Sequence, residues 1–255
     1  MAHVYDKDGN PHFHLKPSQA KKEGLFFSVT EHQKILDKPA LDNWKLGEHL
    51  KMAFNYPPRN GEDIDSFIKR VKAITWRNSG GAAELGTKIH DALEEILSGN
   101  KSIEDVDVDI RKYVAPAIRY FHSKSFNVLD LEKVVVNVEE GYAGTVDCAA
   151  KTKNGLKFIL DWKSRKTAGR KINPFAGQPE QVAAYGAAYF GADAIEKGEV
   201  WGCNAYISTD EFNDQGESRF EVVSYSPEEM KYHWDTFKLT CELWRRAEKY
   251  DPRKN

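Results

Sequence analysis

Two aspartates and a lysine lie on two adjacent predicted β-strands. Asp147 lies on the first, in Gly144-Thr-Val-Asp147, and Asp161 and Lys163 end the second. Between them, the turn sequence Lys153-Asn-Gly155 predicts a hairpin, which would bring Asp147 and Asp161 to neighbouring positions. Residues two apart on a strand share a face, so Asp161 and Lys163 would point the same way.

Paired carboxylates with an adjacent lysine are suited to phosphodiester hydrolysis. Carboxylate oxygens are ligands that Mg²⁺ and Mn²⁺ prefer, and a lysine beside the ion can orient or deprotonate water and stabilise charge on the phosphate. The alternative is a surface strand with an ordinary Asp–Lys pair. The apolar run Phe158-Ile-Leu160 favours the first interpretation, because it places these charges at the exit of a buried strand.

A histidine further upstream could add a nitrogen ligand. Gly86 and His90 are four residues apart in a predicted helix and would share one face. Ile89 belongs to the apolar stripe of that helix, so His90 would border the stripe and could face a cleft. A neutral imidazole suits a divalent ion, Mn²⁺ best. The alternative is a solvated or core-capping histidine.

Three further polar side chains could take part in such a site. Gln181 and Tyr185 are four residues apart in an alanine-rich predicted helix, so their amide and phenol could contact phosphate oxygens together. A tyrosine used only for helix packing is the alternative. Glu132 precedes a β-branched segment and could add a carboxylate, although exposed glutamates are common where strands begin.

The elements that would position these residues are helical in the first half of the chain and mixed in the second. Helices are predicted at 31–36, 41–53, 64–77, 82–97 and 107–125, with a break at Asn78-Ser-Gly-Gly81. Strands are predicted at 133–138, 142–151, 156–163, 199–208 and 218–225. A helix at 178–190 and a final helix capped by Ser226 complete a mixed α/β core.

The composition limits which kinds of partner this protein can bind. It has 255 residues, of which 40% are apolar and 30% charged, and no apolar run long enough to cross a membrane. The net charge of −2 is not that of a bulk nucleic-acid binder, but a groove needs only a local cluster. Five basic residues fall within nine positions, where a solvated loop is the alternative: Lys163, Arg165, Lys166, Arg170 and Lys171.

The cysteines and the amino terminus exclude other classes. Cys148, Cys203 and Cys241 form no C-x-x-C pair, which argues against a disulfide framework, a zinc finger or a four-cysteine iron–sulfur cluster. We expect each to be a small buried residue. The first residues lack the apolar core of a secretory signal and do not look like a transit peptide, so we expect a cytoplasmic protein.

The order of these motifs resembles a known enzyme family. G-x-x-x-H, then E, G-x-x-D, D-x-K and Q-x-x-x-Y closely resemble the RecB-like branch of the PD-(D/E)xK nucleases. Within roughly residues 28–190, Ser28-Val-Thr30 and Asn173-Pro174 extend the resemblance to the family of the mitochondrial genome maintenance exonuclease and its bacterial and phage relatives. A bacterial or phage origin is the simpler expectation.

The resemblance implies a fold and a site. The fold would be a restriction-endonuclease-like core, a central mixed β-sheet flanked by helices, with a helical amino-terminal region that can form an arch. Residues 1–27 would be an extension, and 28–255 a single nuclease domain with a helical part at about 28–125 and a catalytic core at about 126–255. Mg²⁺ or Mn²⁺ would be bound by His90, Asp147, Asp161 and the carbonyl of Trp162, whose side chain is expected in the core. Lys163 would act on water, and Glu132 would be a further acidic residue.

The implied function is DNA hydrolysis without an iron–sulfur cluster. The leading hypothesis is an exonuclease that prefers single strands or free ends. A double-strand exonuclease, a structure-specific endonuclease and an inert nucleic-acid-binding module are the alternatives. Trp44, Phe54, Tyr56 and Trp76 could stack on bases, although we expect at least half of them to pack in the core. The expected DNA-contacting residues are Gln181, Tyr185, Ser164, Arg165, Lys166, Arg77, Ser28 and Thr30.

Overall fold

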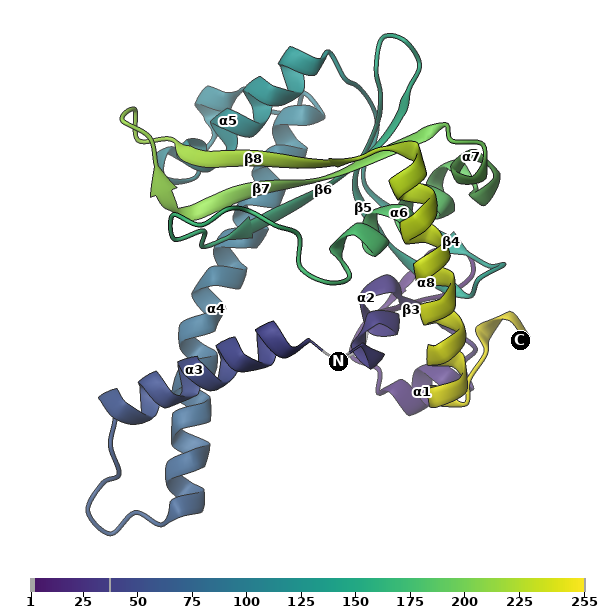
Figure 1. Cartoon of the computed structure of the whole chain (residues 1–255). Helices are drawn as coiled ribbons and strands as arrows, with labels where there is room; N and C mark the ends of the chain where they lie inside the picture. Colours follow the sequence, from purple (N-terminus) through teal and green to yellow (C-terminus); the bar gives the residue numbers. More distant parts are fainter. Residues whose placement is uncertain (1–2, 37, 255) are drawn as a thin grey trace. The chain divides into compact units, whose positions relative to one another are not determined.

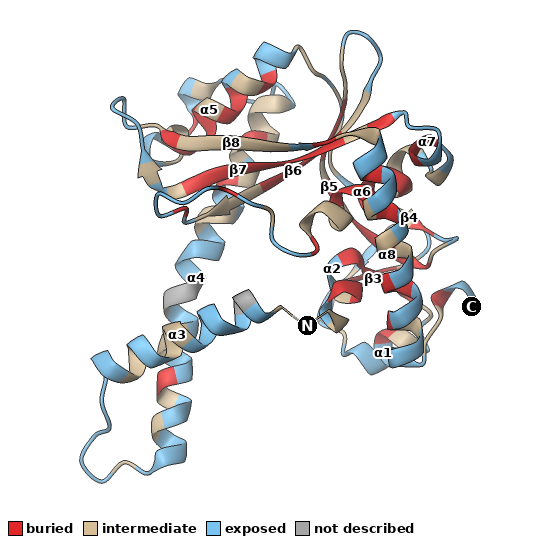
Figure 2. Ribbon diagram, in the orientation of Figure 1, coloured by how far each residue is buried: buried red, intermediate tan, exposed pale blue. Residues whose placement is uncertain are grey.

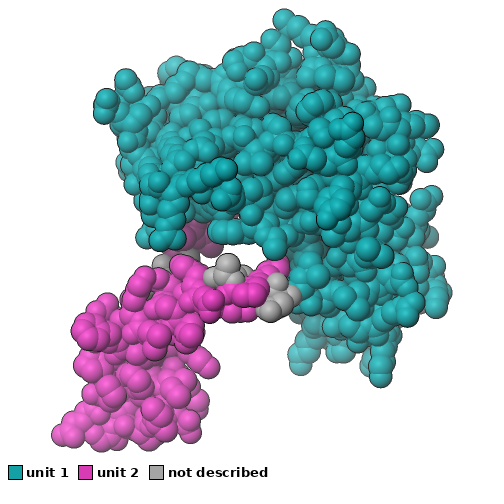
Figure 3. Space-filling model, in the orientation of Figure 1, with its two compact units in different colours: residues 1–36, 89–255 teal, residues 37–88 magenta. Residues whose placement is uncertain are grey.

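The chain divides into two compact units by its internal contacts. The computed structural model describes residues 3–36 and 38–254, and the side chains of residues 40, 41, 78 and 79 are outside this description. One unit comprises Met1–Leu36 and Ile89–Asn255, and the other comprises Asp37–Lys88 (Figure 3). Every predicted site residue except Arg77 belongs to the first unit. The predicted domain boundaries at residues 28 and 126 stay predictions.

A mixed sheet of eight strands forms the centre of the larger unit (Figure 1). Its order is β2-β1-β3-β5-β6-β7-β8, and β4 pairs with β5 beside this path. The pairs β3–β5 and β6–β7 are parallel, and the others are antiparallel. The strands are β1 (Val4–Tyr5), β2 (Pro11–His12), β3 (Phe26–Ser28), β4 (Asn127–Asn137), β5 (Tyr142–Lys151), β6 (Lys157–Arg165), β7 (Val200–Phe212) and β8 (Ser218–Tyr225).

Helices cover both faces of this sheet. Ile159 of β6 packs into a cluster with residues of α6 and α8, whereas its neighbour Phe158 contacts Phe126, which in turn contacts Phe121 of α5. Adjacent strand residues point to opposite faces, so α5 lies across the sheet from α6 and α8. The helices of this unit are α1 (Pro17–Lys22), α2 (Val29–His32), α5 (Val108–Lys124), α6 (Gln178–Phe190), α7 (Ala192–Glu196) and α8 (Pro227–Glu248), with 3₁₀ turns η1 (Gln33–Ile35), η2 (Ile103–Asp105) and η3 (Pro252–Lys254).

The architecture confirms the predicted fold class, a central mixed sheet flanked by helices consistent with a restriction-endonuclease-like core. Ser226 caps α8 as predicted, with its Oγ accepting from the Glu229 amide at 3.3 Å. The three cysteines are buried, as expected. The sequence analysis did not predict β1, β2 and β3, which add the amino-terminal residues to the sheet.

The smaller unit contains α3 (Pro39–Asn55) and the first part of α4 (Ile64–Leu97). The predicted break at residues 78–81 was wrong, because α4 continues through it. A glycine inside a helix costs only about 1 kcal/mol, which the neighbouring turns can offset. Arg70 closes the loop before α4, where its Nη2 donates to Glu62 at 2.7 Å and to the Pro57 carbonyl at 3.0 Å.

Large apolar side chains of the smaller unit are exposed (Figure 2). Phe54 is 87% exposed and Trp76 is 80% exposed, and Trp44 and Tyr56 are exposed as well. The expectation that at least half of these four aromatic residues pack in the core was therefore wrong. The reason is local: α3 and the start of α4 give each other few partners, and Val71 is buried there. Within the described residues, no helix is long and apolar enough to cross a membrane.

Candidate active site

The β5–β6 hairpin brings Asp147 and Asp161, which lie in the middle of their strands, to neighbouring positions, as predicted. The ladder between the two strands runs to the pair Cys148–Leu160, and the two aspartates are the next residues on each strand. The amide of Trp162 donates to Asp147 Oδ2 at 2.7 Å, which fixes this carboxylate against β6. Trp162 itself is buried, as expected.

Three potential metal ligands converge beside β5. His90, near the carboxyl end of α4, has Nδ1 3.8 Å from both Glu132 Oε1 and Asp147 Oδ2. Ligand atoms of these three residues lie within 4.8 Å of one another. On its other side, His90 Nε2 lies 3.1 Å from the carbonyl oxygen of Trp162. Ile89 is fully buried and fixes this turn of the helix, as the apolar stripe predicted.

Glu132 reaches the cluster through an unusual backbone conformation. Its φ is +43°, in the left-handed region that a residue with a side chain seldom adopts within a strand. The flanking pairs Leu131–Cys148 and Lys133–Val146 keep β4 in register, so Glu132 stands opposite Asp147. Backbone strain of this kind costs about 1–3 kcal/mol and is concentrated at functional sites.

The electrostatics of the cluster favour a bound cation. Burial, followed by the negative charge of Asp161, raises the pKa of Asp147 to about 7. For His90, burial opposes the charged form, but the hydrogen bond with Glu132 and the charge of Asp147 outweigh it and raise the pKa. The ionised carboxylates of this cluster are therefore not fully neutralised by the positive groups beside them. Their oxygens and the imidazole are donors that Mg²⁺ or Mn²⁺ accepts, so the residues present fit the predicted ion.

Asp161 is outside this three-residue cluster because it has other partners. Lys163 Nζ lies 2.7 Å from Asp161 Oδ1 and 2.6 Å from Oδ2. The side-chain amide of Asn204 donates to Oδ2 at 2.6 Å. Burial opposes the charged form of Lys163, but the charges of Asp161 and Asp147 raise its pKa, so the side chain is an ammonium ion.

Asn204 is a site residue that the sequence analysis missed. It is 0% exposed on β7 and paired in register with Asp161. One signal was present in the sequence: Asn204 is the polar residue in the apolar run Trp201-Gly-Cys-Asn-Ala-Tyr-Ile207. A buried polar side chain in such a run needs a partner, which here is the carboxylate of Asp161.

Contacts made by Gly144 and Tyr185 explain two further motifs, G-x-x-D and Q-x-x-x-Y. A Cβ atom on Gly144 would lie 2.6 Å from Tyr185 Cε1, so this position of β5 leaves room for the ring only as glycine. Gln181, one turn earlier on α6, donates to the Tyr185 hydroxyl at 2.9 Å. The two predicted residues are therefore paired with each other, and the phenol ring packs on β5, the strand that carries Asp147.

The other predicted DNA-contacting residues have different environments. Ser28 caps α2 by accepting from the Glu31 amide at 3.3 Å, and its hydroxyl lies 3.1 Å from that of Thr30. Ser164 is half-buried, and Lys166 is exposed. The Arg165 guanidinium carbon lies 4.3 Å and 4.5 Å from the ring centres of Phe175 and Tyr206, and Nη2 donates to the Asn173 carbonyl at 2.8 Å. Arg77 is exposed in the smaller unit.

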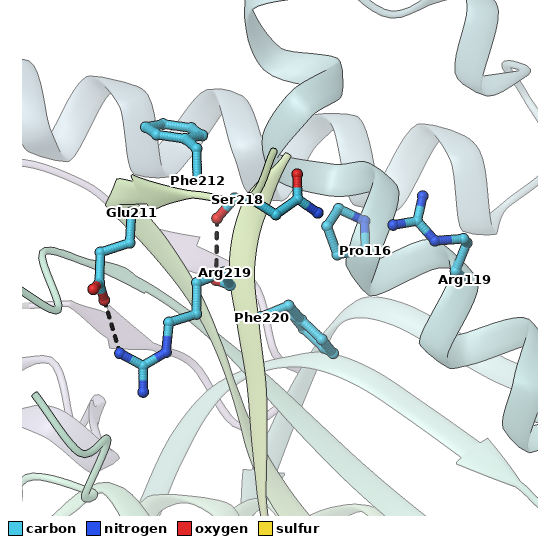
Figure 4. A pocket seen from close by; sticks show the side chains of 8 residues that line it. Pro116, Arg119, Glu211, Phe212, Ser218, Arg219 and Phe220 are labelled. Atoms are coloured by element: carbon cyan, nitrogen blue, oxygen red, sulfur yellow. Dashed lines mark hydrogen bonds and ion pairs between the residues drawn. The ribbon is translucent and has the colours of Figure 1, made fainter. Parts of the chain in front are cut away.

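A hollow of about 500 Å³ lies elsewhere, between α5 and the ends of β7 and β8 (Figure 4). Its arginines are paired, Arg119 with Glu217 at 2.7 Å and Arg219 with Glu211 at 2.8 Å. None of the predicted site residues lines it: the lining consists of Pro116, Arg119, Glu211, Phe212, Asn213, Ser218, Arg219 and Phe220. We therefore place the candidate active site at the carboxylates, not in this hollow.

The fold and the site together define a class: a mixed α/β core whose paired strands present carboxylates and a lysine, which with an imidazole from a helix are suited to a divalent cation. A segment of 102 residues is 30% identical to the human (Homo sapiens) mitochondrial genome maintenance exonuclease 1, and it covers 39% of this chain and 29% of that protein. The chain thus matches less than a third of that relative's length.

Two solved structures are also similar. A "Putative exonuclease" from Eubacterium rectale superposes with a TM-score of 0.46 at 9% identity, covering 93% of this chain and 88% of that chain. The protein SSO0001 gives a TM-score of 0.36 at 12% identity, covering 84% and 89%. Neither likeness is close enough to define the fold of this chain. No family model matches the sequence.

Proposed function

We propose that this protein is a divalent-metal-dependent deoxyribonuclease of the PD-(D/E)xK superfamily, in its RecB-like branch. The observation that carries the proposal is the juxtaposition of the cluster His90–Glu132–Asp147 with the pair Asp161–Lys163, next to the last residue pair of the β5–β6 ladder. The sequence similarity to an enzyme named as an exonuclease supports it.

Mg²⁺ or Mn²⁺ would be held by His90, Asp147, Asp161 and the carbonyl of Trp162, with Glu132 as a further carboxylate. When bound, the ion supplies Lewis-acid activation of the phosphate and of water. Lys163, as an ammonium ion, orients the attacking water and stabilises the negative charge that develops on the phosphate oxygens. These roles need only donors and acceptors that already lie together beside β5 and β6.

The substrate in this proposal is DNA with single-stranded regions or free ends, which the enzyme degrades as an exonuclease. Ser164, Arg165 and Lys166 follow Lys163 along the chain and would contact backbone phosphates, as would Arg77. Tyr185 and Gln181 would support the substrate strand, and Ser28 and Thr30 would lie along its path. The exposed aromatic residues of the smaller unit support the preference for unpaired bases, since each base stacked on an aromatic ring gains about 1–3 kcal/mol.

The first prediction concerns Lys163. We expect wild-type protein to degrade end-labelled DNA with Mg²⁺ or Mn²⁺ and not with EDTA, and Lys163→Ala to lose roughly a hundredfold or more of this activity, because the ammonium ion acts on the reacting groups. Lys157→Ala is the matched control. It removes a lysine from the same strand, where Lys157 pairs with Glu199 at 2.6 Å, and should keep full activity.

The substrates in this assay separate the alternatives. End-labelled single- and double-stranded DNA give the strand preference and polarity from the product ladder, and circular single-stranded DNA tests the need for an end. Cleavage of the circular DNA would mean that the protein is an endonuclease and not an exonuclease. If wild type and Lys163→Ala bound DNA alike and neither cut it with any metal, the protein would be a binding module and the proposed function would be wrong.

A further inference from the structure

A buried asparagine and a buried tyrosine form a hydrogen-bonded row that ends on Asp161. Asn204 Nδ2 donates to Asp161 Oδ2 at 2.6 Å, and the hydroxyl of Tyr225 donates to Asn204 Oδ1 at 2.6 Å. Asp161, Asn204 and Tyr225 are 1%, 0% and 4% exposed. The row thus crosses three adjacent strands, from β8 through β7 to β6, without reaching solvent.

The direction of these bonds determines the orientation of the Asn204 amide. A side-chain amide can turn over and exchange its oxygen and nitrogen, and a carboxylate would repel the oxygen. The hydroxyl of Tyr225 donates its proton to the amide oxygen, so the NH₂ group faces Asp161. The carboxylate, which can only accept, thus selects the orientation in which Asn204 donates to it, and the bond from Tyr225 to the amide oxygen stabilises that orientation.

The tyrosine ring is itself held in place. His233 of α8 lies edge-on to Tyr225, with ring centres 5.5 Å apart, and His233 Nδ1 lies 3.1 Å from Glu180 Oε1. Glu180 immediately precedes Gln181 on α6. The hydroxyl of Tyr225 is consequently fixed by α6 and α8 as well as by its own strand.

We propose that Asn204 and Tyr225 are positioning residues that orient Asp161 for a divalent cation. Among the described residues, Oδ2 contacts both Asn204 and Lys163, whereas Oδ1 contacts Lys163 alone, so we assign Oδ1 to the ion. Neither residue would touch DNA or the reacting atoms, and both act through Asp161. The proposal rests on the proposed function, because it assigns Asp161 to the metal site. Partners of this kind typically change metal affinity by 10–100-fold.

The test is titration calorimetry of the full chain with Mn²⁺ alone. We expect Tyr225→Phe, which removes one hydroxyl, to raise the Mn²⁺ Kd roughly tenfold, and Asn204→Leu to raise it at least as much. Tyr142→Phe is the matched control. It loses an equally buried hydroxyl, which donates to the Ala184 carbonyl at 2.7 Å, and should stay within about twofold of wild type.

A double variant separates positioning from general stability. Because Tyr225 acts through Asn204, adding Tyr225→Phe to Asn204→Leu should raise the Kd no further. Both Tyr225→Phe and Tyr142→Phe should lower the thermal unfolding temperature, the second at least as much, because the Tyr142 hydroxyl also accepts from the Asn137 side-chain amide at 3.3 Å. If Asn204→Leu fails to fold, the comparison of these two tyrosine variants decides the question alone.

Each outcome has a separate meaning. Equal Mn²⁺ affinity for wild type and Tyr225→Phe, equal loss in Tyr142→Phe, or additive losses in the double variant would overturn the positioning role. In those cases Mn²⁺-dependent degradation of DNA by wild type would leave the nuclease function standing. If wild type neither bound Mn²⁺ nor degraded DNA, both proposals would fail together.

Discussion

At the scale of single residues, the candidate site has more negative than positive groups. Three carboxylates, Glu132, Asp147 and Asp161, are close to one lysine and one histidine. Lys163 pairs with Asp161, while burial, followed by the charge of Asp161, raises the pKa of Asp147. A buried carboxylate in this state is stabilised either by a proton or by a cation, and the two compete for it.

This competition predicts the pH dependence of metal binding. Burial and Asp161 raise the pKa of Asp147 to about 7, and the pKa of His90 is raised as well. Below pH 7 Asp147 holds a proton, and the raised pKa of His90 favours its protonated form too; a metal ion must displace these protons, so affinity should rise with pH. Between pH 5.5 and 8 we expect the Mn²⁺ Kd to fall on the order of tenfold or more.

Calorimetry in buffers of different ionisation enthalpy checks this prediction. Below pH 7 the heat of Mn²⁺ binding should depend on the buffer, because protons are released as the ion binds. Above pH 8 that dependence should be small. A Kd that is constant over this range would mean that Asp147 and His90 are not ligands.

The site was predictable from sequence where chemistry and strand spacing coincide. Asp161 and Lys163 share a face because they are two residues apart, and the turn before them determined the partner strand. Asn204 was not found, because its role depends on the parallel register of β6 and β7, which brings together residues 43 positions apart. The stacking of Arg165 on Phe175 and Tyr206 likewise depends on a loop conformation that periodicity does not reveal.

At the scale of elements, the contact between β5 and α6 depends on one missing side chain. A Cβ atom on Gly144 would lie 2.6 Å from Tyr185 Cε1. The backbone there does not require glycine, so the cost of Gly144→Ala is steric. We expect a loss of about 1–3 kcal/mol of stability from overpacking, together with reduced metal affinity as the ring moves away from Asp147.

Thermal unfolding and Mn²⁺ titration of Gly144→Ala test this contact. Gly47→Ala is the control, because no atom lies within 4 Å of its added Cβ and alanine favours the helix. Gly144→Ala combined with Tyr185→Leu should recover part of the lost stability. Wild-type stability in Gly144→Ala would show that α6 can shift without cost.

Element boundaries were predictable where local signals mark them. Helix α6 has the bounds predicted from its alanine-rich run, and β8 has those predicted from its alternation. Strands β1, β2 and β3 have only two or three residues each, too few for a periodicity. Helix α4 was divided wrongly, because Gly80 and Gly81 resemble a helix end unless turns on both sides continue the pattern.

At the scale of the whole molecule, a neutral histidine makes the larger unit sensitive to acid. His32 is fully buried, its Nδ1 donates to the Ser28 carbonyl at 3.0 Å, and its ring centre lies 4.2 Å from that of Trp244 on α8. Among the described residues, Nε2 has no hydrogen-bond partner. Burial, with a smaller contribution from the charge of Arg245, lowers the pKa of His32 to about 4.

This pKa predicts the direction of the stability change. Between pH 6.5 and 4 the unfolded chain protonates His32 and the folded chain does not, so stability should fall as the pH falls through this window. The shift corresponds to roughly 3 kcal/mol. Urea unfolding at pH 7, 5.5 and 4.5 should show a smaller loss for His32→Phe than for wild type.

His122→Gln is the control for this experiment, because it removes an exposed imidazole and should leave the acid sensitivity in place. For each variant, the free energy of unfolding at low pH is compared with that of the same variant at pH 7. A constant loss of stability caused by the substitution therefore does not affect the result. Parallel pH profiles for wild type and His32→Phe would rule out His32 as the source of acid sensitivity.

The parallel pairing of β3 with β5 has a consequence for the synthesis of this protein. Phe27 pairs with Tyr142, so 114 residues lie between two neighbouring positions of the sheet. Closing so large a loop has a high entropic cost, and the partner strand does not exist until the ribosome has passed residue 142. Strand β3 can pair with β1 as soon as both are made, but its other edge must wait for β5 while more than half of the chain is synthesised. The Leu25-Phe-Phe27 segment thus emerges long before the carboxylates of the site are assembled.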